Sequence, residues 1–124
     1  MDDKDVWEFI ESEDLWIYDK LILAKRLGYL CGPAGVPPPE TNQYIIRPCI
    51  NFRMMSRGAK IVHLSENAHH DIPDGYFWCE VFQGRHLSFD FHHGKQVLAV
   101  EGFRNSERLD RFSKWQRCED VLTL

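Results

Sequence analysis

Histidine is the residue type that first raises a question of chemistry in this chain, because six histidines stand among 124 residues. Two groups of them are contiguous, His69-His70-Asp71 and His92-His93. Zinc sites usually take paired ligands a few residues apart, whereas adjacent residues on a strand point to opposite faces. We therefore expect surface and turn histidines here, and no metal site.

Three polar residues, His86, Ser88 and Asp90, alternate along one predicted strand and so share a face. They are the residue types of a nucleophilic triad. Side chains two residues apart on a strand stand nearly parallel and about 7 Å apart, so Ser88 and His86 do not reach hydrogen-bonding distance without another element. A polar strand face turned toward a ligand or toward water explains the same residues.

Basic residues follow one another three or four apart near the end of the chain: Arg104, Arg108, Arg111, Lys114 and Arg117. Such a stripe has the charge to bind the phosphates of a nucleic acid. Acidic residues are interleaved with it, however, which mutes its field. We expect a salt-linked, solvated face and no nucleic-acid partner.

Composition predicts one ordinary folded domain over residues 1–124, with 44% apolar and 27% charged residues. The apolar runs are too short for a membrane span. The net charge of −4 hides an acidic segment over residues 1–14, and the remainder is mildly basic. The four cysteines are scattered, without a CxxC pair or a leading hydrophobic segment, which predicts a reduced, intracellular setting.

The elements that would position these residues follow from periodicity, and they predict an α+β fold. We expect two N-terminal helices, a mainly antiparallel sheet of about five strands, and a C-terminal helix. The segments are an acidic helical lead-in (1–14), a helix (15–28), a Pro-rich connector (29–43), the sheet (44–103) and an amphipathic tail (104–124). Gln83-Gly84 and His93-Gly94 stand where hairpin turns would make the last three strands a meander.

Three strings occur in an order that resembles the central part of the ATP-grasp superfamily, over roughly residues 19–103. "DKLILAKRLGYLCGPAGVPPPE" is similar to the family's Asp-Lys helix that runs into Gly-Val-x-x-Pro, and "YIIRPCINF" is similar to its apolar strand ending in Lys-Pro. "EVFQGRHLSFDF" resembles its Glu-x-Phe-x-Gly-x-Glu-x-Ser-x-Asp hairpin. Short phage-encoded proteins of this kind carry similar "RP" and "FWCE" strings, so the resemblance implies a viral protein in the host cytoplasm.

The resemblance implies ATP as cofactor and five nucleotide-binding residues. Lys20 and Arg47 would contact phosphate, Glu80 would lie beside the adenine and ribose, and His86 and Asp90 would lie on the face nearest the ribose or substrate. Cations opposite a triphosphate are what such a site requires. The same residues also have an ordinary interpretation, with Lys20 on a helix surface and Arg47 paired with Glu80 or Asp90.

Two departures from the family pattern bear on catalysis. The string "RMMSRGA" offers only Gly58 where the family has a glycine-rich phosphate loop. The chain also reaches Leu124 before the position of the family's magnesium ligands. We therefore expect magnesium only with a complementary half, and no complete carboxylate–amine ligase in this chain alone.

Two functional hypotheses stay open. One is an ATP-grasp-like nucleotide-binding domain, a pseudoenzyme by itself. The other is a non-enzymatic viral interaction protein, a virion component or host-directed inhibitor, that does not bind nucleotide. A half-sheet with an open edge predicts self-association or a bound protein partner in either case.

Overall fold

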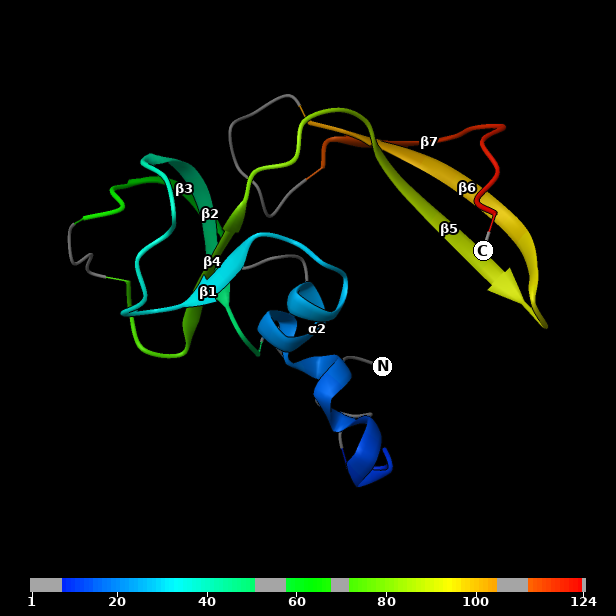
Figure 1. The fold of residues 1–124 in the computed structure, drawn as a ribbon. Coiled ribbons are helices and arrows are strands. Elements are labelled where there is room, and N and C mark those ends of the chain that lie inside the picture. The colour runs from blue at the N-terminus through cyan, green and yellow to red at the C-terminus, as the bar shows by residue number, and fades with distance from the viewer. Residues whose placement is uncertain (1–7, 51–57, 68–71, 105–111, 124) are drawn as a thin grey trace. The chain divides into compact units, whose positions relative to one another are not determined.

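The structure is a computed structural model that describes residues 8–50, 58–67, 72–104 and 112–123. Its internal contacts divide the chain into two compact units, Met1–Val81 and Phe82–Leu124. The first unit holds two short helices and a four-stranded sheet, and the second holds a three-stranded sheet (Figure 1). Each unit therefore has its own sheet.

Two short helices precede the first sheet. The element η1 is a 3₁₀ helix over Ser12–Tyr18, and α2 is an α-helix over Lys20–Arg26. Asp19 separates them, because its carboxylate accepts hydrogen bonds from the backbone N–H groups of Leu21 and Ile22 and so caps α2. Within the described ranges no helix is long and apolar enough to cross a membrane.

The predicted helices are therefore only partly confirmed. The single helix predicted over 15–28 is broken at the Asp19 cap into η1 and α2, and Gly28, at φ +81°, follows the end of α2. Of the acidic lead-in over 1–14, residues 8–10 form a turn and a bend, and residues 1–7 lie outside the described part of the chain.

The first sheet is antiparallel in the order β1-β4-β2-β3. Its strands are β1 (Cys31–Pro33), β2 (Asn42–Pro48), β3 (Lys60–Leu64) and β4 (Tyr76–Glu80). One face buries Tyr44, Ile46, Leu64 and Trp78, and the other buries Phe77 and Cys79 against Ala24 of α2. Because both faces are covered, β2 and β4 carry the continuous apolar strings "YII" and "YFWC" instead of an alternating pattern.

The predicted Pro-rich connector, residues 29–43, is part of this core. It supplies β1, in which Gly32 pairs directly with Trp78. A Cβ atom on Gly32 would come within 2.6 Å of the indole ring, so only glycine lets Trp78 lie across this strand. The indole N–H donates a hydrogen bond to the carbonyl of Val36 at 2.7 Å, which fixes the loop beyond β1 on the same ring.

The second sheet is antiparallel in the order β5-β6-β7. Its strands are β5 (His86–His92), β6 (Lys95–Phe103) and β7 (Lys114–Arg117). The hairpin between β5 and β6 turns at His93 and Gly94, whose φ angles are +49° and +78°. Two consecutive left-handed residues are typical of a type I′ turn, which confirms the predicted hairpin at His93-Gly94.

The predicted single sheet of about five strands is wrong. All five predicted strands are present, but the described residues form seven strands in two sheets. The strand β4 already lies between β1 and β2, so it has no free edge for β5. Gln83-Gly84 consequently connects two sheets and is not a hairpin turn.

The predicted C-terminal helix is wrong as well, because the described part of the tail 104–124 contains β7. The spacing of Phe112 and Trp115 imitates a helical face, but in the structure Trp115 pairs with Gly102 of β6. Pairing satisfies the backbone groups on the open edge of β6, and this outweighs the local periodicity. The predicted stripe residues Arg108 and Arg111 lie outside the described residues.

Candidate functional site

Lys20 and Arg47, the two predicted phosphate contacts, lie on neighbouring segments of the first unit. Lys20 begins α2, and its backbone N–H donates to the carbonyl of Cys49 at 2.7 Å. Arg47 is in β2, two residues before Cys49, and it pairs with Phe77. Because Phe77 packs against Ala24 of α2, the Arg47 side chain is on the face of the sheet that α2 covers. Burial lowers the pKa of its guanidinium, and its buried Nε has no hydrogen-bond partner among the described residues.

Glu80 lies at the end of β4, and its polar groups are used within the sheet. Its carboxylate accepts a hydrogen bond from the backbone N–H of Leu30 at 2.6 Å, and its own N–H donates to the carbonyl of Leu30 at 2.9 Å. Glu80 pairs with Tyr44 while Arg47 pairs with Phe77, three residues away, so Glu80 and Arg47 point to opposite faces. The structure does not bring these two predicted residues together as a pair.

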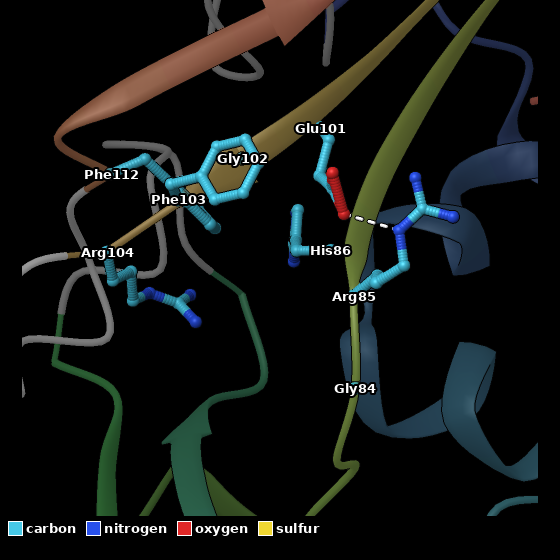
Figure 2. Close-up of a pocket in the computed structure, with 8 residues that line it drawn as sticks. All are labelled: Gly84, Arg85, His86, Glu101, Gly102, Phe103, Arg104 and Phe112. Atoms are coloured by element: carbon cyan, nitrogen blue, oxygen red, sulfur yellow. Dashed lines mark hydrogen bonds and ion pairs between the residues drawn. The ribbon is translucent and has the colours of Figure 1, made fainter. Parts of the chain in front are cut away.

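A pocket of about 390 Å³ opens in the second unit, beside the start of β5 and the end of β6 (Figure 2). Strand pairing brings His86 opposite Gly102 at its floor. Its lining consists of Gly84, Arg85, His86, Glu101, Gly102, Phe103, Arg104 and Phe112. His86 is therefore the predicted site residue that lines this pocket.

Three rings gather on one face of the second sheet, and we call His86, Phe112 and Trp115 the ring cluster. The His86 and Phe112 centroids are 4.5 Å apart, those of Phe112 and Trp115 are 4.6 Å apart, and those of His86 and Trp115 are 5.7 Å apart. A Cβ atom on Gly102 would come within 2.6 Å of Phe112. The missing side chain at Gly102 is thus what allows the rings to close over the strand.

Arg104 lies beside the ring cluster, and a second cation–aromatic contact joins Lys114 to Phe103. The Arg104 guanidinium carbon lies 4.1 Å from the Phe112 ring centroid, and the Lys114 ammonium lies 5.1 Å from that of Phe103. Both distances are within the range of a cation–π interaction. Partial removal from water among the rings, and then the charge of Arg104, lower the pKa of His86. The imidazole is accordingly neutral at neutral pH, with one nitrogen to donate and one to accept.

Arg85 also lines the pocket, but its guanidinium serves the fold. Its Nε contacts the Glu101 carboxylate, as Figure 2 shows, and its two terminal nitrogens bind both oxygens of Asp120 at 2.8 and 2.9 Å. These bonds raise the pKa of Arg85 and lower that of Asp120. Arg85 therefore fastens the C-terminal segment to the sheet. Arg104, whose guanidinium lies against the Phe112 ring, is the pocket cation that we take as the candidate to contact a ligand.

Asp90, the remaining predicted site residue of the second unit, is not among the residues that line the pocket. Asp90 shares the face of His86 but lies four residues farther along β5, where it pairs with Leu98 of β6. In the described part of the chain, no group of three or more His, Cys, Asp or Glu residues is placed to hold a metal ion. His69-His70-Asp71 and most of the glycine-poor string "RMMSRGA" fall outside that part.

Sequence reasoning missed the rest of this site, because the tail with Phe112 and Trp115 was predicted to be an amphipathic helix, and Arg104 was assigned to its solvated basic face. Two signals in the sequence point the other way. Trp115 and Arg117 are two residues apart, which is the spacing of residues on one face of a strand. Gly102 interrupts a predicted strand, and an isolated glycine in a strand often marks the close approach of another group.

Comparison of the chain with protein-family models, with curated proteins and with solved structures finds no match.

Proposed function

We propose that this protein binds a nucleotide in the pocket of its second sheet, and that it acts as a binding domain without completing a reaction alone. The observation that carries the proposal is the ring cluster with Arg104 beside it, in a pocket where Gly102 lets the rings pack directly on the strand. The pocket volume is within the roughly 300–1,000 Å³ of small-molecule sites.

The chemistry of the lining matches the two parts of a nucleotide. A guanidinium offers a planar fork of donors that suits phosphate oxygens, and Arg104 supplies one at the rim. Aromatic faces and edges accept a base without a strong sequence preference, as in single-strand binding proteins. Neutral His86 adds one donor and one acceptor for the ribose or the base.

Arg104 and His86 are thus the residues that we expect to contact ligand, and Lys20, Arg47 and Glu80 form the competing location that the ATP-grasp resemblance implies. In that location Glu80 is already engaged by Leu30, and Arg47 is directed into the α2-covered face. For this reason we place the nucleotide in the second unit.

Titration with ATP, ADP, AMP and inorganic phosphate, with and without magnesium, tests the proposal. In amide NMR spectra we expect shifts at His86, Gly102 and Arg104 and none at Lys20, Arg47 or Glu80. Ligand at about 100 times its Kd adds about 2.7 kcal/mol to the free energy of unfolding, which a thermal scan detects easily. Shifts confined to the first unit would move the site there, and no response at millimolar nucleotide would refute nucleotide binding.

A matched pair of variants locates the phosphate contact. Arg104→Ala removes the guanidinium at the pocket, and we expect it to weaken ATP binding about tenfold, the loss of one charge-assisted hydrogen bond. Lys95→Ala removes the same charge at the other end of the β5–β6 hairpin, where Lys95 pairs with His92, and should leave binding unchanged. Equal losses in both variants would indicate a general effect of charge instead of a contact.

A second candidate is the non-enzymatic interaction protein, and exposed apolar side chains on the second sheet favour it. Val97, Trp115 and Phe103 are 55%, 48% and 39% exposed. Aromatic and aliphatic residues of this kind form the centre of protein interfaces. If they mediate self-association, light scattering will show a mass that rises with concentration, and Val97→Lys will abolish the rise. A constant monomer mass would contradict self-association through this surface.

A further inference from the structure

Cys31 and Cys79 are direct partners across the antiparallel pair of β1 and β4. The N–H of Glu80 donates to the carbonyl of Leu30 at 2.9 Å, so the Leu30–Glu80 pair is hydrogen-bonded. Hydrogen-bonded and non-hydrogen-bonded pairs alternate along an antiparallel ladder, so the adjacent Cys31–Cys79 pair is of the non-hydrogen-bonded kind. Pairs of this kind place their Cα atoms about 4.5 Å apart, with both side chains on one face.

This geometry allows a disulfide. Bonded cysteines have Cα atoms about 4.4–6.8 Å apart, so the two strands need little movement to bring the sulfurs together. Both thiols are free in the structure. We propose that Cys31 and Cys79 form a reversible cross-strand disulfide when the protein meets a small disulfide oxidant, such as oxidised glutathione.

The reaction is a pair of thiol–disulfide exchanges. Cys31 is the more exposed of the two, whereas Cys79 is buried. The Cys31 thiolate attacks oxidised glutathione and forms a mixed disulfide, releasing one glutathione thiolate. The Cys79 thiolate then attacks the Cys31 sulfur and releases the second glutathione thiolate, so two protein thiols are oxidised while one small disulfide is reduced to two thiols.

Neighbouring charges act on these thiols. Burial raises the pKa of both Cys31 and Cys79, which slows exchange at neutral pH and makes it faster at alkaline pH. Arg47 points to the same face as Cys79, and its charge opposes the burial effect on that thiol. Arg47 is therefore a positioning residue for the second exchange, because it stabilises the attacking thiolate of Cys79.

Cys49 provides the matched control. It packs against the same buried cluster, but it is not opposite Cys79 in the sheet. Cys49 follows Pro48, and Pro48 pairs with Tyr76, which is three residues from Cys79 in β4. Trypsin does not cleave before Pro48, so Cys31 and Cys49 remain in one tryptic peptide, residues 27–53. The variant Cys49→Ser is needed to assign the bond to Cys31.

The experiment incubates the full chain in glutathione buffers of increasing oxidised fraction, with mass spectrometry and a thermal scan as readouts. We expect a disulfide-linked peptide pair in the wild type, in Cys49→Ser and in Cys118→Ser, and none in Cys31→Ser. The oxidised chain should unfold roughly ten degrees higher, and dithiothreitol should reverse the change. In Arg47→Met, the Cys31–glutathione mixed disulfide should accumulate.

Two outcomes would overturn the proposal. A chain whose four thiols stay free in fully oxidised glutathione at alkaline pH has no such pair. A linked peptide that is present in the wild type but lost in Cys49→Ser would assign the bond to Cys49. If Cys31→Ser fails to fold, Cys31→Ala and direct alkylation of the wild type at each redox step answer the same question.

Discussion

Single glycines decide the placement of large aromatic side chains in both units. Gly32 lies beneath Trp78 in the first sheet, and Gly102 lies beneath Phe112 in the second. In both places the missing Cβ atom leaves space on the strand, and an aromatic ring fills it and packs against the backbone. Such glycine–aromatic pairs offset the weakness of glycine in a strand.

The variant Gly102→Ala tests this role at the candidate site. The added Cβ would meet Phe112 at 2.6 Å and Trp115 at 3.0 Å, so we expect both rings to move and the free energy of unfolding to fall by about 1–3 kcal/mol. Urea unfolding and the NMR shifts of the His86 ring measure the two effects. Ser88→Ala, an exposed change on β5, is the control, and unchanged ring shifts in Gly102→Ala would contradict the role.

His86 gives stability a defined pH dependence. Because its pKa in the folded protein is lowered, His86 is neutral in both states above its unfolded value of 6.5 and contributes nothing there. As the pH falls below that value, the unfolded chain takes up a proton that the folded chain resists, so stability decreases until the folded pKa is passed. Urea unfolding between neutral pH and about pH 5 should show this decrease in the wild type.

His86→Gln is expected to remove that part of the pH dependence, whereas His63→Gln, a substitution in the other sheet, should keep it. Identical pH profiles for His86→Gln and the wild type would mean that the rings do not resist protonation of His86.

At the scale of elements, the C-terminal segment that follows β7 is held in place by side chains of the residues before it. The Asp120 carboxylate accepts hydrogen bonds from both terminal nitrogens of Arg85. Its backbone carbonyl accepts one from the Gln96 side chain at 2.8 Å. The same Gln96 accepts a hydrogen bond from the N–H of Leu122 at 2.9 Å. One arginine and one glutamine thus anchor residues that belong to no strand.

Asp120→Asn removes one charge from this anchor, and we expect faster amide exchange at Leu122 with β5 and β6 unaffected. Glu119→Gln, next to it in the chain, is the control and should leave exchange at Leu122 unchanged. Because the pKa of Asp120 lies below its usual 3.8, the anchor should persist on acidification and fail only at lower pH. Loss of protection at Leu122 near pH 5 would contradict this.

Local pattern predicted the strands well and their partners poorly. Residues such as "KIVHL" and "HLSFDFH" form strands where β-branched and aromatic residues and turn glycines indicated them. The partner of each strand depends on which edges are free, and no local signal reports that β4 is central. The candidate site needed the same information, because Arg104 and Phe112 reach His86 only after β7 pairs with β6.

At the scale of the whole molecule, the two units differ in how much they bury. The first unit has an apolar cluster on each face of its sheet. In the second unit, Ala99 is the one buried apolar residue among those that the structure describes. Small sheets need a substantial buried face to be stable alone, so the second unit has little of its own to hold it folded.

Expression of the two units as separate chains tests this difference. Residues 1–81 should give a dispersed amide spectrum and a sigmoidal thermal transition, and residues 82–124 should give neither. The full chain is the control for each fragment. A dispersed spectrum from residues 82–124 would show that its three strands are self-sufficient.

The glycine–aromatic pairs also limit how this protein is able to diverge. A mutation that enlarges Gly32 or Gly102 is acceptable only after the ring above it has become smaller. Relatives should therefore vary at these positions in concert, with Gly32 tied to Trp78 and Gly102 to Phe112. Such covariation would identify distant homologues whose overall identity is too low to align, and would fix the register of β1 against β4 in each of them.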